Sequence, residues 1–159
     1  MQLLLDSENE TARVAASLAE LLGAGDLIGL EGDLGAGKTS FARAAIYGLG
    51  VDPNEAITSP TFALIHHYEG RLPIVHADFY RLMSESELEE LGVEEMLCGG
   101  YVMFVEWGRK FADFASRVTL WAELSSVSEQ ARGLRLRATG PRGEAILAGL
   151  RQLLRLEEA

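Results

Sequence analysis

A glycine-rich segment that ends in lysine and threonine carries the clearest chemical signal in this sequence. Residues 32–39 read Gly-Asp-Leu-Gly-Ala-Gly-Lys-Thr and match the pattern G-x-x-x-x-G-K-[ST] in full. Glycines allow backbone conformations in which successive amide N–H groups point inward, and the N-terminus of a following helix adds a positive dipole end. The segment is therefore predicted to be a phosphate-binding loop, or P-loop, for a nucleoside triphosphate with Mg²⁺.

The residue types within this loop predict separate roles. We expect Lys38 to reach the β- and γ-phosphates and the Thr39 hydroxyl to bind Mg²⁺. A compact ammonium suits a phosphate loop better than a planar guanidinium, and only two of the 14 basic residues are lysines. The predicted nucleotide-binding set from this segment and the residue after it is Asp33, Leu34, Gly35, Ala36, Gly37, Lys38, Thr39 and Ser40.

Phosphoryl transfer also needs an acidic group at a strand end to hold the magnesium. Glu106 follows the continuous apolar run 101–105, which is typical of a strand buried on both faces. Ligands of α/β sheets bind at this end of the strands, so Glu106 is the first candidate for the metal ligand. The alternative is a surface carboxylate without a functional role.

Asp78 is a second acidic candidate, because it ends the β-prone run 74–77. It could orient the attacking water or the water shell of the metal, and a structural ion pair with Arg81 is the alternative. His76 in the same run is interpreted as a core or hydrogen-bonding histidine rather than a catalytic one. Lys38, Asp78 and Glu106 form the predicted catalytic set.

The elements that position these residues follow from hydrophobic periodicity. The run 27–30 predicts a strand before the loop, residues 39–49 a helix after it, and residues 61–68 with 73–78 an antiparallel hairpin. Further helices are expected at 8–22, 84–91 with a continuation to 97, and from 142 onward, and further strands at 101–105, 117–124 and 134–139. Ser7 with Glu10 and Ser84 with Glu87 read as capping boxes. This pattern predicts an α/β fold, a P-loop NTPase-like three-layer α/β/α domain with a mixed, mainly parallel-core sheet.

Composition limits the classes of partner. At 159 residues, with 48% hydrophobic and 24% charged residues, the chain is expected to form one domain over residues 1–159. Its apolar runs are too short for a signal peptide or a membrane span, which predicts a cytoplasmic protein without a membrane partner. A net charge of −10 disfavours DNA and unaided tRNA binding. The single cysteine, Cys98, is expected to be a small core residue.

Guanine recognition has no support in the sequence. Neither of the two asparagines, Asn9 and Asn54, starts an N-K-x-D element, and the D-x-x-G near the site, at 26–29, precedes the P-loop. A Ras-like GTPase is therefore disfavoured, and ATP is the expected nucleotide.

Four segments in this order resemble the TsaE family (formerly YjeE), the bacterial ATPases of tRNA threonylcarbamoyladenosine (t6A) biosynthesis. They are the P-loop, Thr-Ser-Pro-Thr-Phe at 58–62, His-Ala-Asp-Phe-Tyr-Arg at 76–81 and Glu-Trp at 106–107. The resemblance implies an ATP- and Mg²⁺-binding protein with weak hydrolysis alone that docks on a TsaB–TsaD pair. That pair would transfer the threonylcarbamoyl group to adenosine 37 of tRNAs reading ANN codons, so tRNA would be reached only through partners.

The resemblance also implies roles for individual residues. The segment 58–62 would be the first switch, with Thr61 or Ser59 near the γ-phosphate. Asp78 would be the catalytic or metal-orienting acid, and Glu106 the magnesium ligand.

Three further residues have roles through this resemblance alone. Trp107 would lie beside the nucleotide or at the partner surface, with a buried aromatic as the alternative. Thr11 and Arg132 resemble positions that flank the adenine.

Two other functions stay open on the sequence. A small-molecule kinase would need an acceptor pocket and a basic lid, whereas the segment 84–97 is acidic. A nucleotide-gated binding module would use ATP to order the segment near Thr61, with hydrolysis incidental.

Overall fold

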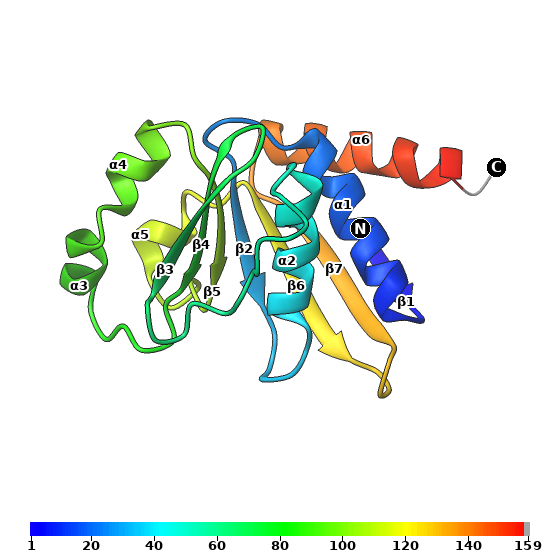
Figure 1. Cartoon of the computed structure of the whole chain (residues 1–159), viewed down its shortest axis with the longest axis horizontal. Helices are drawn as coiled ribbons and strands as arrows, with labels where there is room; N and C mark the ends of the chain where they lie inside the picture. The colour runs from blue at the N-terminus through cyan, green and yellow to red at the C-terminus, as the bar shows by residue number, and fades with distance from the viewer. Residues whose placement is uncertain (158–159) are drawn as a thin grey trace.

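A mixed β-sheet with a parallel centre forms the middle of the protein (Figure 1). The computed structural model describes residues 1–157, so the last two residues of the expected domain lie outside the described residues. The strands are β1 Gln2–Leu5, β2 Leu27–Glu31, β3 Ile65–Glu69, β4 Pro73–Asp78, β5 Val102–Glu106, β6 Leu120–Ser126 and β7 Arg132–Ala138. They stand in the order β1-β7-β6-β2-β5-β4-β3. Parallel pairing joins β6, β2, β5 and β4, and the other pairs are antiparallel.

Helices cover both faces of this sheet. They are α1 Glu8–Leu21, α2 Lys38–Gly48, α3 Glu85–Glu90, α4 Val93–Cys98, α5 Ala112–Ala115 and α6 Pro141–Glu157. Figure 1 shows α1, α2 and α6 on one side of the sheet and α3, α4 and α5 on the other. The three-layer α/β/α architecture predicted from the sequence is confirmed.

Alternation along the central strand explains why two separate cores form. In β2, Ile28 and Leu30 face the cluster that includes Phe41 of α2, while Leu27 faces the cluster that includes Phe114 of α5. Successive strand side chains point to opposite faces, so an apolar run such as β2 supplies both layers at once. Burial on both faces holds the central strands firmly, and their C-terminal ends become a rigid edge for a site.

Several boundaries differ from the sequence prediction. The edge strand β1 and the four-residue helix α5 were not predicted, because each is too short for a periodic signal. The first strand of the hairpin begins at Ile65 rather than 61, since residues 61–63 form a turn and Leu64 has a φ of 66°. In the part of the chain described, no helix is both long enough and apolar enough to cross a membrane.

Two local predictions were wrong. Cys98 is exposed rather than buried, because it ends the short helix α4, whose buried residue is Val93 at the other end. Ser7 accepts a hydrogen bond from the Glu10 backbone N–H, but the Glu10 carboxylate accepts from Asp6 N (2.6 Å), so the first capping box is only half formed. The box predicted at the start of α3 is complete.

Candidate functional site

The P-loop lies at the C-terminal edge of the parallel strands. β2 ends at Glu31, residues 32–37 turn, and α2 begins at Lys38. Figure 1 shows this loop projecting from the lower end of the sheet, on the side where the β6–β7 turn also lies. Lys38 is buried, and its Nζ donates to the carbonyl oxygens of Gly32 (2.5 Å) and Asp33 (3.0 Å). An ammonium has three donors, so one remains for a further acceptor in the loop.

The hydroxyl of Thr39 and the carboxylate of Glu106 meet beside the loop. Thr39 Oγ1 donates to Glu106 Oε1 at 2.9 Å, across 67 residues of sequence. The other carboxylate oxygen, Oε2, lies 3.3 Å from His76 Nε2. Glu106 is only 3% exposed, and each of its two oxygens has a partner within the protein. The two predicted metal ligands are therefore adjacent in space.

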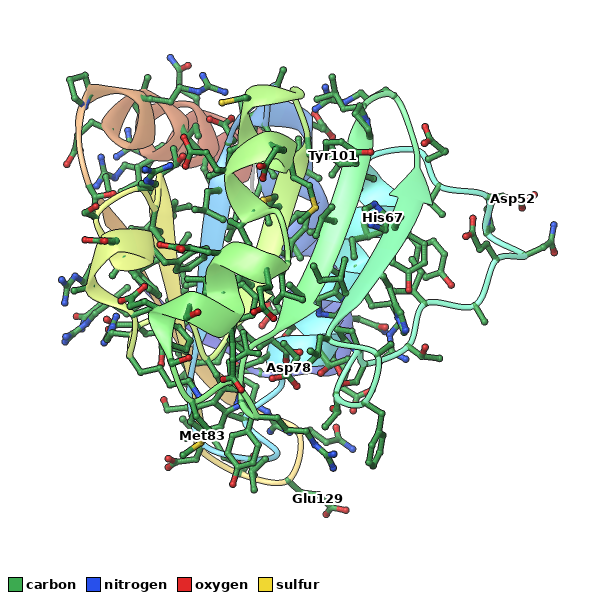
Figure 2. All side chains as sticks on the ribbon, turned by 90° about the vertical axis from the view of Figure 1, so that its left-hand side faces the viewer. Asp52, His67, Asp78, Met83, Tyr101 and Glu129 are labelled. Atoms are coloured by element: carbon green, nitrogen blue, oxygen red, sulfur yellow. The ribbon has the colours of Figure 1, made fainter. Side chains whose placement is uncertain are left out.

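Asp78 lies next to Glu106 because their strands are in parallel register. Asp78 of β4 pairs directly with Glu106 of β5, and Figure 2 shows Asp78 at the lower end of the sheet. Its carboxylate accepts from Thr61 Oγ1 (3.2 Å) and from the backbone N–H of Tyr80 (2.9 Å). Arg81 instead lies over the Phe62 ring, 4.2 Å from its centroid. The hydrogen bond to Thr61 joins the predicted switch segment to the acidic edge of the sheet.

Trp107 turns back over the P-loop directly after the Glu106 carboxylate. It has a φ of 61°, a left-handed conformation that costs a bulky residue about 1–2 kcal/mol. Its half-buried ring lies 4.6 Å from Lys38 Nζ and 5.2 Å from the Tyr80 ring. The backbone N–H of Arg109 donates to Glu31 Oε1 (3.2 Å), which ties the turn after β5 to the end of β2. These contacts hold the indole against the phosphate loop.

Two hollows meet at the N-terminal end of α2. A hollow of about 260 Å³ has a lining that includes the P-loop, Thr61, Asp78, Glu106 and Trp107. A larger hollow of about 520 Å³ lies between α1 and α2. The residues common to both linings are Gly37, Ser40 and Arg132. The two hollows therefore adjoin at the start of α2, and the smaller one holds the acidic side chains Asp78 and Glu106.

Thr11 and Arg132, the two residues expected near the adenine, both line the larger hollow. Thr11 is 5% exposed, and its hydroxyl donates to the Ser7 carbonyl (3.2 Å). Arg132, at the start of β7, donates to carbonyl oxygens of the β6–β7 turn and packs close to Gly37. The structure therefore brings both residues to the larger hollow, and Arg132 also lines the smaller one.

The donor atoms beside the loop suit Mg²⁺. Among the side chains that the structure describes, no three His, Cys, Asp or Glu converge as a preformed metal cluster. Mg²⁺ in phosphoryl-transfer sites is usually held by one or two protein oxygens, with phosphates and waters completing its shell. The hydroxyl of Thr39 and the carboxylate of Glu106 match that donor set.

Sequence reasoning missed part of the site. Tyr47 and Arg43 of α2 line the larger hollow, and neither was singled out. Arg43 lies about one turn and Tyr47 about two turns into the helix after the P-loop, and this spacing could have indicated both residues. His76 was interpreted as a hydrogen-bonding core histidine, and it is fully buried against the Glu106 carboxylate. Its partner was not predictable, because the contact joins two strands 30 residues apart.

A parallel-core α/β/α sheet with a P-loop between its central strand and the following helix defines a P-loop NTPase-like protein. Residues 5–134 match the family model described as threonylcarbamoyl adenosine biosynthesis protein TsaE. The chain therefore belongs to the TsaE family, and the resemblance seen in four sequence segments is confirmed.

Relatives of known sequence or structure agree with this assignment. The tRNA threonylcarbamoyladenosine biosynthesis protein TsaE of Treponema pallidum is 36% identical, over 81% of this chain and 94% of the relative. The protein of the same name from Bacillus subtilis is 36% identical, over 86% and 85% of the two chains. The crystal structure of Bacillus subtilis YdiB superposes with a TM-score of 0.79 at 28% identity, covering 96% of this chain and 94% of YdiB.

Proposed function

We propose that this chain, as a single domain over residues 1–159, is a Mg²⁺-dependent ATPase subunit of the t6A modification of tRNA. The observation that carries the proposal is the contact between Thr39 Oγ1 and Glu106 Oε1 (2.9 Å) beside Lys38. It brings together, at a phosphate loop, two side-chain oxygens of the kind that hold a nucleotide-bound magnesium. Membership in the TsaE family supports the tRNA pathway.

Each part of the site has a role in this proposal. Lys38 would neutralise the β- and γ-phosphates, and Thr39 with Glu106 would hold Mg²⁺, which offsets charge on the transferred phosphoryl group. Asp78 would orient the attacking water, and its hydrogen bond from Thr61 would hold the carboxylate in place for that role. Trp107 would close over the phosphates.

The larger hollow supports adenine binding. It opens from the P-loop between α1 and α2, and its lining combines small apolar residues of both helices with polar side chains, among them Thr11, Arg43 and Arg132. A purine ring buries its faces well in such an environment, while a few polar groups fix its orientation. ATP would thus extend from the acidic edge of the sheet toward Tyr47.

Partner docking has support from exposed apolar side chains near the nucleotide end. Phe62 is 82% exposed, Met83 85% and Leu34 80%, and they belong to the switch segment, the β4–α3 connection and the P-loop. Figure 2 shows Met83 at the same end of the molecule as Asp78. Exposed apolar residues grouped around a site indicate an interaction surface. We propose that a TsaB–TsaD-type complex in the cytoplasm covers it, and that tRNA is reached only through that complex.

The test uses the two lysines of the chain as a matched pair. ATP hydrolysis with Mg²⁺ is measured for wild type, Lys38→Ala and Lys110→Ala, alone and with a TsaB–TsaD pair. We expect weak hydrolysis that rises with the pair, falls at least about 100-fold in Lys38→Ala and stays near wild type in Lys110→Ala. Lys110 is exposed and donates to the Tyr80 carbonyl, outside the phosphate loop. Equal losses in both variants, or no response to the pair, would refute the proposal.

A further inference from the structure

His76 is a buried polar residue whose hydrogen bonding is incomplete. It lies in β4 opposite Phe104 of β5 and has no exposed surface. Its Nε2 lies 3.3 Å from Glu106 Oε2, whereas Nδ1 has no partner among the described residues. A buried polar atom without a partner costs free energy, about 1–3 kcal/mol. A histidine with this cost in the core calls for an explanation, and its hydrogen bond to the Glu106 carboxylate offers one.

The contacts indicate which ring nitrogen carries the hydrogen. Glu106 Oε2 is an acceptor, so Nε2–H donates to it. A hydrogen on Nδ1 would point into the core without an acceptor. The Nε2–H tautomer therefore agrees with both observations.

This arrangement leaves the Glu106 carboxylate little freedom to rotate. Oε1 accepts from Thr39 at 2.9 Å and Oε2 from His76 at 3.3 Å, so a donor faces each oxygen. Rotation about the last side-chain bond would break both hydrogen bonds. If Mg²⁺ took the place of the Thr39 hydrogen beside Glu106, the bond to His76 would be the one that remains to hold the carboxylate in place.

We infer that His76 is a positioning residue for the magnesium site, which holds Glu106 so that Oε1 faces Thr39 and the metal. The inference rests on the proposed function, because it assumes that Thr39 and Glu106 bind Mg²⁺. Groups that hydrogen-bond to metal ligands typically change metal affinity 10- to 100-fold when removed. The effect should therefore appear as a change in Mg²⁺ affinity rather than in nucleotide affinity as such.

Two amide substitutions separate positioning from packing. The side-chain nitrogen of Gln can occupy the place of His Nε2, and that of Asn only the place of Nδ1. His76→Gln therefore keeps the donor to Glu106, whereas His76→Asn loses it and keeps a polar core side chain. His76→Leu serves as the second variant without a donor, and its own side chain has no polar atom to leave unpaired.

The readout is binding, not turnover. Binding of the β,γ-imido analogue of ATP is measured by calorimetry for folded wild type and variants, in EDTA and over a Mg²⁺ titration. We expect similar binding in EDTA for all proteins and a half-saturating Mg²⁺ concentration about 10-fold or more higher in His76→Asn and His76→Leu. His76→Gln should remain within about 3-fold of wild type, since its donor is retained.

The possible failures are distinguishable. If wild type binds the analogue without any Mg²⁺ dependence, the proposed magnesium site itself is refuted, and the inference with it. If wild type depends on Mg²⁺ but all the variants match it, or if every variant loses affinity equally in EDTA and in Mg²⁺, His76 has a packing role only and the inference alone is overturned.

Discussion

Gly32 and Gly35 in the P-loop allow a direct test of how the loop is built. Both have positive φ, at 145° and 80°, so both are expected to resist side chains. They differ in the space around them. A Cβ on Gly32 would lie 2.4 Å from the Leu124 carbonyl oxygen and 3.0 Å from Ala36 Cβ, whereas a Cβ on Gly35 would have no atom within 4 Å. Gly32→Ala should therefore be much more destabilising than Gly35→Ala.

The expected magnitudes follow from these two geometries. At Gly32 the backbone conformation costs about 1–3 kcal/mol, and a clash with backbone that cannot move away adds about 1–3 kcal/mol. We therefore expect a loss of about 4 kcal/mol from the free energy of unfolding. At Gly35 the left-handed conformation costs about 1–2 kcal/mol, and the reduced freedom of the unfolded chain returns about 0.4–1 kcal/mol. The net loss there is about 1 kcal/mol.

Urea unfolding and thermal melting measure the difference. For a chain of this size each kcal/mol shifts Tm by about 2–4 °C, so Gly32→Ala should melt about 8–16 °C lower and Gly35→Ala about 2–4 °C lower. Wild type and both variants are compared without nucleotide, because Gly35 also lines the hollow. If the two variants lose equal stability, the close approach of Leu124 to the loop does not determine its shape and the reasoning is wrong.

Three further predictions concern the acidic edge and the surface around it. Glu106→Gln keeps the volume of a buried side chain but removes its charge and one of its two acceptor oxygens, so Mg²⁺-dependent hydrolysis should fall at least about 100-fold. Phosphate release should stay near wild type in Glu123→Gln, a control on β6 whose carboxylate pairs with Arg109, and equal losses in the two variants would contradict the assignment. Burial raises the pKa of the half-buried Glu31 carboxyl above its ordinary value, despite the Arg109 backbone N–H and Lys38, which lower it. The folded state then holds this proton more tightly than the unfolded chain, and this contribution to stability is lost as pH rises through the raised pKa. The free energy of unfolding of Glu31→Gln, measured in urea and compared with that of wild type, should therefore be more favourable at pH 7 than at pH 4. The same difference between the two proteins at both pH values would contradict a raised pKa for Glu31. Finally, Phe62→Ser with Met83→Ser should reduce stimulation by a TsaB–TsaD pair at least about 10-fold while analogue binding is kept. Leu4→Ser, a control at an exposed leucine of the edge strand β1, should leave the stimulation intact, and an equal loss there would argue against a localised docking surface.

The P-loop was predictable from sequence because its chemistry is local. Backbone freedom, the lysine and the hydroxyl all lie within residues 32–39, and the apolar strand and the helix that flank them are also continuous in sequence. The buried run that ends at Glu106 was predictable for a similar reason, since a strand covered on both faces must be apolar throughout. Hydrophobic periodicity and local composition were therefore enough to predict the fold class and the strand ends that carry the two acidic residues.

Short and exposed elements were beyond this reasoning. β1 has four residues and pairs with β7 at the edge of the sheet, and α5 has four residues that bury Phe114. Neither is long enough to show a repeat, and both form because the rest of the fold presents a surface to them. The exposure of Cys98 likewise depends on where a six-residue helix ends on the surface.

The sequence by itself determined which groups are available: a phosphate loop, a hydroxyl and two acids at strand ends. Only the tertiary structure decided which of them meet. The parallel register of β4 and β5 sets Asp78 beside Glu106, and the packing of α2 on the sheet brings Thr39 to the same carboxylate. The contact between His76 and Glu106 likewise needs two strands to pair. Such contacts arise from hydrogen-bond register between distant segments, and no local pattern of residues records that register.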